Sequence, residues 1–334
     1  MGCLLSVCPS AWGWNHRASS FELGFVADLD KASKVADSTT PLFQSYLQKA
    51  VLHRKLVDDK VEYTVSWKDV APFTTSLNEA GRGFELSELA WCRGDLHTFD
   101  DRTGLVFRLE KFQLSDQPHD IRAVPVTIVT EGDGSTTKGK KHEWATAKDG
   151  ELYMGSTGKE FITGNDVDNT HNMWVSILSK EGVLRFEDWT DNFAKVREFV
   201  GCGYPGYLIH EAIEWSAVHR KWFILPRRVS KDAYDETADE QRGSNVMIVA
   251  SEDFSRLEVR TVGPITPERG FSSFKFVPST QDSVIVALKS VEIEATKSQS
   301  SYVTVFTVDG NVLLPETPLP GTFKYEGVAF LREY

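Results

Sequence analysis

The sequence predicts an all-β fold, a five-bladed β-propeller, from two observations. Short runs rich in Val, Ile, Phe, Tyr and Trp recur along the 334 residues, separated by Asp-Gly, Gly-Asp, Thr-Gly and Pro-containing turns. Five of these runs open alike, with a Ser or Glu set among apolar residues and followed by a strand, a polar turn and another strand. A repeat of this size, filled with about four strands, is typical of one propeller blade.

The strand-like runs follow one another along most of the chain. Clear examples are Gly104–Leu109, Val124–Val129, Lys221–Leu225, Ser283–Leu288 and Tyr302–Val308. Two segments predict helices, and both are short: Pro41–Leu52 and Trp189–Val200. The second has Thr190 and Asp191 as a start signal.

The five similar openings place one oxygen-bearing side chain at the same point of each repeat. Successive members lie between 54 and 68 residues apart: Ser87, Glu143, Glu211, Ser272 and Glu326. Few residues follow the last opening, so its blade needs strands from the N-terminal part, and Phe21–Asp30 and Lys60–Trp67 can supply them. We expect the first and last strands to pair and close the ring, which protects both edges. Two successive β-sandwich domains are the alternative architecture.

The repeated oxygens predict a cation at the centre of the propeller. The innermost strands of a closed propeller surround a channel, so equivalent positions face one another. Three carboxylates in a partly dry channel repel, and they must take up protons or a cation. No sulfur or imidazole is offered, and calcium accepts about six to eight oxygen ligands in an irregular shell. We therefore expect Ca2+ at the five positions; the alternative is that each is an ordinary polar residue at a strand end.

Composition excludes several classes of function. The formal net charge of -11, from 48 acidic and 37 basic residues, repels a phosphate backbone, and no Lys/Arg-rich stripe offsets it, so nucleic acid is not expected as a partner. The four cysteines fit neither a disulfide framework nor a zinc site. No apolar run reaches about 18 residues, so no transmembrane segment is predicted.

We expect residues 1–20 to form a leader or flexible N-terminus ahead of a single propeller domain at residues 21–334. A calcium site of modest affinity fills outside cells or in secretory compartments, which favours a secreted or lumenal protein. The first six residues also match the acceptor pattern for myristoylation at Gly2, with Cys3 available for palmitoylation. An acylated, membrane-associated protein is therefore the alternative location.

Several segments together resemble the calcium-activated nucleotidase family, the soluble apyrases. The resemblance runs from about Phe25 to Phe330. Its most specific segments are Ala27–Asp30, Gly81–Glu88, Asp100–Gly104, Gly139–Trp144, Pro205–Glu211, Leu225–Arg228, Gly270–Phe276 and Lys324–Gly327. It implies a five-bladed propeller with calcium on the five repeated positions, and calcium-dependent hydrolysis of nucleoside di- or triphosphates of the UDP, GDP, ADP or ATP class. A homodimer is left open.

The resemblance also implies which residues act. It assigns catalysis to Asp28, Asp101 and Glu143, and substrate binding to Arg102, Trp144, Lys159, Arg227, Arg228 and Lys275. In these roles guanidinium groups bind phosphate, a carboxylate orients or deprotonates the attacking water, and an indole stacks on the base. Two other functions stay open: a non-catalytic propeller that binds proteins around a structural calcium, and another calcium-propeller hydrolase of the lactonase or arylesterase type.

Overall fold

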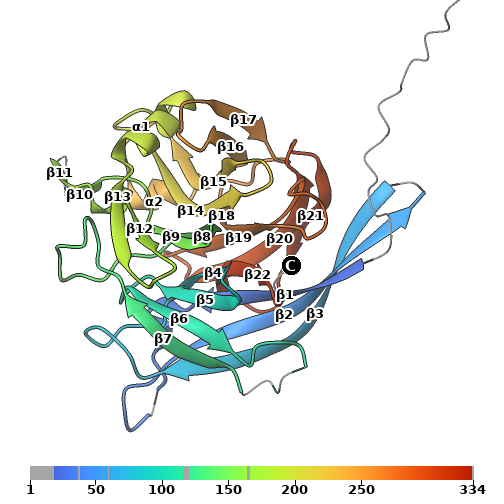
Figure 1. The fold of residues 1–334 in the computed structure, drawn as a ribbon, viewed down its shortest axis with the longest axis horizontal. Helices are drawn as coiled ribbons and strands as arrows, with labels where there is room; N and C mark the ends of the chain where they lie inside the picture. The colour runs from blue at the N-terminus through green and yellow to red at the C-terminus, as the bar shows by residue number, and fades with distance from the viewer. Residues whose placement is uncertain are drawn as a thin grey trace, which may run out of the picture.

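The structure is a computed structural model that describes residues 19–36, 38–58, 60–115, 117, 120–163 and 166–332. The predicted acyl acceptors Gly2 and Cys3, and most of the predicted leader, lie outside these residues. Within the described ranges, no helix is long and apolar enough to cross a membrane. Five four-stranded sheets stand around a central axis (Figure 1), which confirms the predicted five-bladed propeller.

Each blade runs from an inner strand at the axis to an outer strand at the rim. From the inside outwards, blade by blade, the strands are β22 (Lys324–Phe330), β1 (Ser19–Asp28), β2 (Phe43–Val57) and β3 (Lys60–Thr75); β4 (Leu86–Cys92), β5 (Asp95–Asp100), β6 (Leu105–Glu110) and β7 (Arg122–Ile128); β8 (Trp144–Lys148), β9 (Glu151–Gly155), β12 (Trp174–Leu178) and β13 (Leu184–Asp188); β14 (Tyr207–Ser216), β15 (Lys221–Ser230), β16 (Val246–Ser251) and β17 (Leu257–Thr261); and β18 (Gly270–Phe276), β19 (Val284–Ile293), β20 (Ser298–Thr307) and β21 (Val312–Pro318). The five inner strands contact one another in a closed ring.

The first and last described strands close this ring. Strand β1 pairs antiparallel with β22, from Leu23 opposite Phe330 to Asp28 opposite Lys324. The predicted pairing of the two ends of the chain is therefore confirmed. It also places Asp28 beside the C-terminal inner strand, at one mouth of the channel.

One predicted helix is wrong and the other is confirmed. Pro41–Leu52 does not form a helix, because this stretch belongs to β2, where buried and partly buried side chains first alternate with the period of a strand. Helix α1 (Thr190–Phe199) matches the second prediction and buries Phe193 and Val196. The remaining elements are the hairpin β10 (Phe161–Thr163) and β11 (Asp166–Asn169), the short helix α2 (Glu236–Asp239), and the 3-10 turns η1 (Asp30–Ser33) and η2 (His171–Met173).

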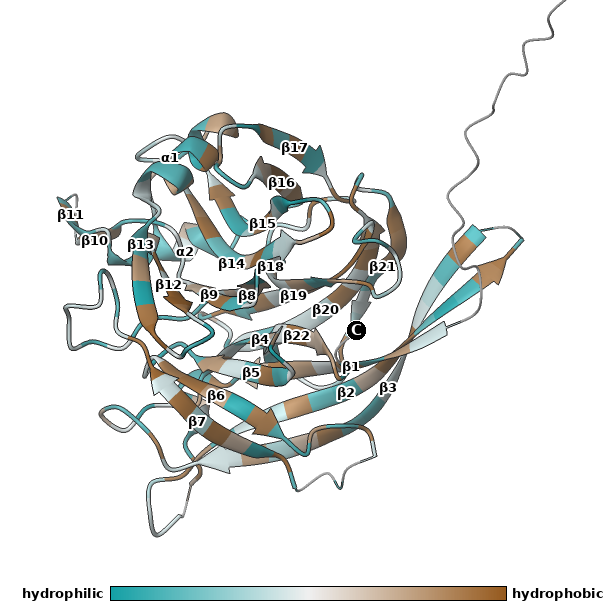
Figure 2. Cartoon of the chain, viewed as in Figure 1, coloured by the Kyte–Doolittle hydropathy of each residue, from teal (hydrophilic) through white to brown (hydrophobic). Residues whose placement is uncertain are grey.

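The hydrophobic core lies between neighbouring blades rather than on the axis. Phe25 of β1, for example, belongs to one buried cluster with Val286 of β19 and Val305 of β20. Figure 2 shows apolar and polar segments following each other along the strands. Burying each such side chain contributes about 1.5–3 kcal/mol. The blades therefore hold the inner strands in place, and the axis is left to polar side chains.

Candidate active site

The five repeated oxygens lie on or next to the inner strands, where strand pairing is irregular. Ser87 of β4, Ser272 of β18 and Glu326 of β22 are each left out of the register with the neighbouring strand. Glu211 lies inside an irregular stretch of β14, and Glu143 directly precedes β8. A bulge re-aims the side chain of its extra residue. The local irregularities therefore explain how these side chains leave the normal alternation of their strands.

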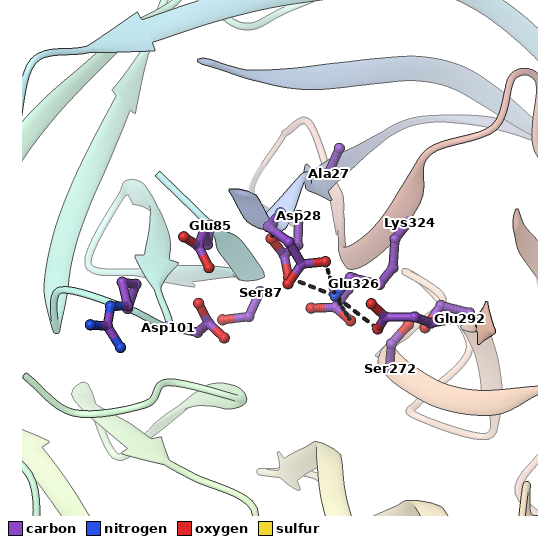
Figure 3. Close-up of polar contacts among 12 residues, drawn as sticks. Ala27, Asp28, Glu85, Ser87, Asp101, Ser272, Glu292, Lys324 and Glu326 are labelled. Atoms are coloured by element: carbon purple, nitrogen blue, oxygen red, sulfur yellow. Dashed lines mark hydrogen bonds and ion pairs between the residues drawn. The ribbon is translucent and has the colours of Figure 1, made fainter. Parts of the chain in front are cut away.

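The two ring serines tie neighbouring blades together. The Ser87 hydroxyl donates to the carbonyl oxygen of His142 at 2.6 Å, and the Ser272 hydroxyl donates to that of Tyr325 at 3.4 Å. Each acceptor directly precedes a ring glutamate of another blade. Figure 3 shows Ser87, Ser272 and Glu326 projecting into the centre of the ring.

Each ring carboxylate contacts a cationic side chain. Arg227 Nη1 lies 2.5 Å from Glu211 Oε2 and 3.1 Å from Glu326 Oε1, so one buried guanidinium joins two blades. The Lys141 ammonium pairs with Glu143. Burial raises the pKa of Glu143 to about 8, against the opposing effect of Lys141, and burial also raises the pKa of Glu326 well above its usual range. The ring carboxylates therefore need positive charge.

The donor set of the ring fits a hard divalent cation. Three carboxylates and two hydroxyls supply only oxygen, which calcium prefers, and the buried acids gain from any added positive charge. A second acidic group lies nearby, since carboxylate oxygens of Asp28, Asp30 and Glu85 are within 4.8 Å of one another. The Lys324 ammonium already lies 2.8 Å from Asp28 (Figure 3), and it lies 3.0 Å from Asp30. Lys324 also lies 3.7 Å from the ring acid Glu326, so one ammonium contacts both acidic groups.

A cavity of about 420 Å³ includes the ring carboxylates and the groups around them. It is lined by Asp28, Asp30, Arg82, Asp101, Lys141, Glu143, Ile209, Glu211, Arg227, Arg228, Glu236, Asp239, Glu240, Glu292, Glu294, Lys324 and Glu326. Basic side chains from several blades thus share one space with acidic ones. The acidic groups outnumber the basic ones, so the cavity can bind a polyanion only with added positive charge, and it can hold a water molecule next to a carboxylate.

Two of the predicted catalytic acids differ in how their oxygens are used. Asp101 Oδ2 lies 2.8 Å from the Lys141 ammonium, whereas its buried Oδ1 has no hydrogen-bond partner among the described residues. Burial raises the pKa of Asp101 to about 6, against the effect of Lys141. In Asp28, Oδ1 accepts from the Asp30 N–H at 2.7 Å and Oδ2 pairs with Lys324. Asp101 therefore retains an acceptor for a further molecule.

Among the predicted site residues, Trp144 and Lys275 lie away from the 420 Å³ cavity. Trp144 is fully buried and packs on Trp189 with a ring separation of 5.8 Å, so in this structure its indole lies in the core. Lys275 lies 3.3 Å from Glu88, also pairs with Glu214, and lines a separate cavity of about 550 Å³. Lys275 therefore does not line the cavity that holds the ring carboxylates.

Two further predicted substrate-binding residues do not line the 420 Å³ cavity. Arg102 lies 3.2 Å from Glu79 and forms an ion pair with it. Lys159 lies with its ammonium 4.3 Å from the ring centroid of Tyr234. Asp28, Asp101, Glu143, Arg227 and Arg228 do line the cavity, as do the ring acids Glu211 and Glu326.

Sequence reasoning missed several residues of this cavity. Lys141 and Lys324 each stand two residues before a ring glutamate, and Arg82 lies in a segment quoted for the resemblance, so a search for basic residues beside the repeat would have found them. Asp239 and Glu292 carry no such signal, because neither belongs to a repeated or family-like segment.

Comparison with known proteins gives consistent matches over nearly the whole chain. The family model described as Apyrase matches residues 29–331. The chain is 42% identical over 313 residues to soluble calcium-activated nucleotidase 1 of Rattus norvegicus, covering 93% of this chain and 74% of that protein. It is 41% identical over 319 residues to apyrase apy-1 of Caenorhabditis elegans (94% and 85%) and 39% identical over 315 residues to an apyrase of Cimex lectularius (93% and 82%).

Solved structures give only a weak similarity. A mutant of the Synechocystis apocarotenoid oxygenase aligns with a TM-score of 0.31 and 8% identity, covering 93% of this chain and 64% of that chain. This similarity bears neither on the site nor on its chemistry.

Proposed function

This chain belongs to the apyrase family, and from that premise we propose that it hydrolyses nucleoside di- and triphosphates in a calcium-dependent reaction that releases inorganic phosphate. The observation that carries the proposal is the 420 Å³ cavity, in which Arg227 and Arg228 share one space with Asp101 and the ring carboxylates. A phosphoanhydride substrate needs both groups, because its charge must be neutralised and its attacking water must be positioned.

The cavity lining holds more carboxylates than basic groups, so an anionic substrate needs the bound calcium as well as the basic side chains. The formal net charge is -11, which repels an anionic substrate at long range. Arg227 and Arg228 provide planar guanidinium groups that suit bidentate contacts with phosphate oxygens, and Arg82, Lys141 and Lys324 line the same cavity. Together with a bound calcium ion, these cations would contact the oxygens of a di- or triphosphate.

Asp101 is the carboxylate best placed to orient the attacking water and accept its proton. Its pKa of about 6 leaves it ionised at neutral pH, and Oδ1 is a buried acceptor with no hydrogen-bond partner among the described residues. A buried acceptor without a partner is costly, so a water or substrate hydrogen bond is favoured there. Lys141 holds the other oxygen and so fixes the orientation of the carboxylate.

The ring residues Ser87, Glu143, Glu211, Ser272 and Glu326 would hold the calcium ion. When bound, calcium supplies positive charge that stabilises phosphoryl oxygens and lowers the pKa of a bound water. Lys141 connects the ring to Asp101, because its ammonium contacts both Glu143 and Asp101.

The proposal is tested by measuring phosphate release from UDP, GDP, ADP and ATP in calcium, in magnesium and in excess chelator. We expect phosphate release with calcium and almost none with chelator. The rates for the four nucleotides also show which base the protein prefers. Phenyl acetate and a lactone serve as comparison substrates. Hydrolysis of these esters without phosphate release would instead indicate a lactonase or arylesterase, and inactivity on every substrate would favour a protein-binding propeller.

The location in the cell is part of the same proposal. A calcium site of modest affinity fills in the secretory lumen or outside cells, and this supports the secretory route. Mass spectrometry of the native N-terminus distinguishes a cleaved leader from acylation at Gly2 or Cys3. An acylated N-terminus would overturn the secretory assignment.

A further inference from the structure

Two tyrosines lie next to Asp239, one of the acids that line the 420 Å³ cavity. The Tyr234 ring lies 5.4 Å from the Tyr207 ring in an edge-on arrangement. The Tyr207 hydroxyl donates to Asp239, which lines the 420 Å³ cavity. Asp239 also lies 3.5 Å from Nε of Arg228. A single acidic side chain thus connects the tyrosine pair to a guanidinium expected to bind phosphate.

Tyr234 is open to solvent, although the Tyr207 ring that it contacts is buried. Its exposed fraction is 41%, whereas that of Tyr207 is 3%. It belongs to the segment between β15 and α2, and α2 contributes Glu236 and Asp239 to the cavity lining. An exposed aromatic ring in this position offers apolar area to a planar group that extends out of the cavity.

Lys159 adds hydrogen-bond donors to this aromatic surface. Its ammonium lies 4.3 Å from the Tyr234 ring centroid, which is a cation–π contact. Its hydrogen bond within the described part of the chain goes to the Glu160 carbonyl oxygen at 3.3 Å, and it forms no ion pair there. An ammonium has three donors, so further donors are available to the ring nitrogens and carbonyl oxygens of a nucleobase.

We propose that Tyr234, supported by Tyr207 and accompanied by Lys159, forms the subsite for the heterocyclic base of the substrate. This inference rests on the proposed function, because the phosphates of the same molecule would occupy the neighbouring cavity. The buried Trp144 cannot take this role. The subsite binds a base through stacking on the exposed part of the Tyr234 ring, with Lys159 as a donor at its edge.

The test compares substrates that have a base with one that lacks it. Tyr234→Ala should raise KM about tenfold for UDP and ADP, in line with the usual effect of removing one stacking partner. KM for inorganic tripolyphosphate should stay at the wild-type value, and Tyr234→Phe, which keeps the ring, should behave like the wild type. Phe199→Ala is the matched control, since Phe199 is an exposed aromatic on α1 that does not line the cavity.

Equal effects of Tyr234→Ala on tripolyphosphate and on nucleotides, or no effect on either, would overturn the base subsite while leaving the proposed hydrolysis intact. Calorimetric binding of a nucleoside diphosphate gives a second readout that needs no turnover, and we expect the same tenfold weakening there. If the wild-type protein released no phosphate from any nucleotide, the proposed function would fail, and the binding measurement alone would decide on the subsite.

Discussion

Lys141 Nζ lies 2.8 Å from Oδ2 of Asp101, and this ion pair leaves the other carboxylate oxygen of Asp101 without a hydrogen-bond partner among the described residues. The same ammonium contacts Glu143 of the ring. Lys141 therefore orients two carboxylates: that of Asp101, which can accept a proton, and that of Glu143, which can bind metal. This relationship distinguishes Asp101 from Asp28, both of whose oxygens are engaged.

Replacing Asp101 with Asn should reduce kcat by about 10²–10⁴ and change KM little, because an amide of the same size cannot accept the proton of the attacking water. In the wild type we expect activity to rise with pH as Asp101 ionises, around its pKa of about 6. Steady-state kinetics between pH 5 and 8 measure both effects. The matched control is Asp95→Asn, at an exposed acid on β5. Wild-type kcat in Asp101→Asn would remove this residue from the reaction.

Replacing Arg227 with Met should separate calcium binding from substrate binding. Arg227 donates to Glu211, Glu326 and the Ser290 hydroxyl, so its removal leaves two ring acids without their guanidinium. Calcium should then bind about tenfold more tightly, roughly 1.4 kcal/mol, because it no longer competes with a fixed cation. The ratio kcat/KM for nucleotides should fall, since a phosphate contact is lost.

Calorimetric titration with calcium measures the first effect, and Arg228→Met is its control. Arg228 lines the same cavity but pairs with Asp239 instead of a ring acid. Its loss should weaken substrate binding and leave calcium affinity unchanged. An Arg227→Met protein that bound calcium more weakly than the wild type would contradict the competition between guanidinium and metal.

Replacing Lys275 with Met should affect stability and not substrate binding. Lys275 is the cation shared by the buried acids Glu88 and Glu214, and removing one partner from such a group typically costs about 3–5 kcal/mol. KM for nucleotides should not change, because Lys275 lines the separate cavity. Urea unfolding and steady-state kinetics test the two statements. A clear rise in KM with unchanged stability would return Lys275 to the nucleotide site.

The repeat placed the five oxygen-bearing residues on or next to the inner strands, because they recur at one point of every blade. The repeat located Ser87, Ser272 and Glu326 although the bulges that re-aim them leave no recognisable sequence signal of their own. The repeat also predicted how the first blade closes. The last repeated segment, around Glu326, is followed by too few residues to form outer strands, so β1, β2 and β3 complete its sheet. Residue types together with spacing were therefore enough for the centre of the fold.

The resemblance assigned Trp144 and Lys275 to the substrate, and strand geometry explains why neither lines the 420 Å³ cavity. Trp144 follows Glu143 directly, and successive side chains of a strand point to opposite faces, so the indole enters the core between blades. Lys275 is three residues beyond Ser272, which is about 10 Å along a strand. Tyr234 gave no signal at all, because an exposed loop residue has no periodic pattern.

Lys140 predicts how stability depends on pH. It is fully buried, its amine donates to the Trp174 carbonyl oxygen at 2.8 Å, and burial lowers its pKa from 10.5 to about 7, against the effect of Glu131. Between these two values the unfolded chain binds a proton that the folded protein does not, so the free energy of unfolding should rise with pH. Relative to Lys140→Met, the wild type should gain up to about 1.4 kcal/mol per pH unit above pH 7. Urea unfolding of both proteins at pH 7, 8 and 9 measures this difference. Parallel pH profiles for the two proteins would show that Lys140 remains protonated in the fold.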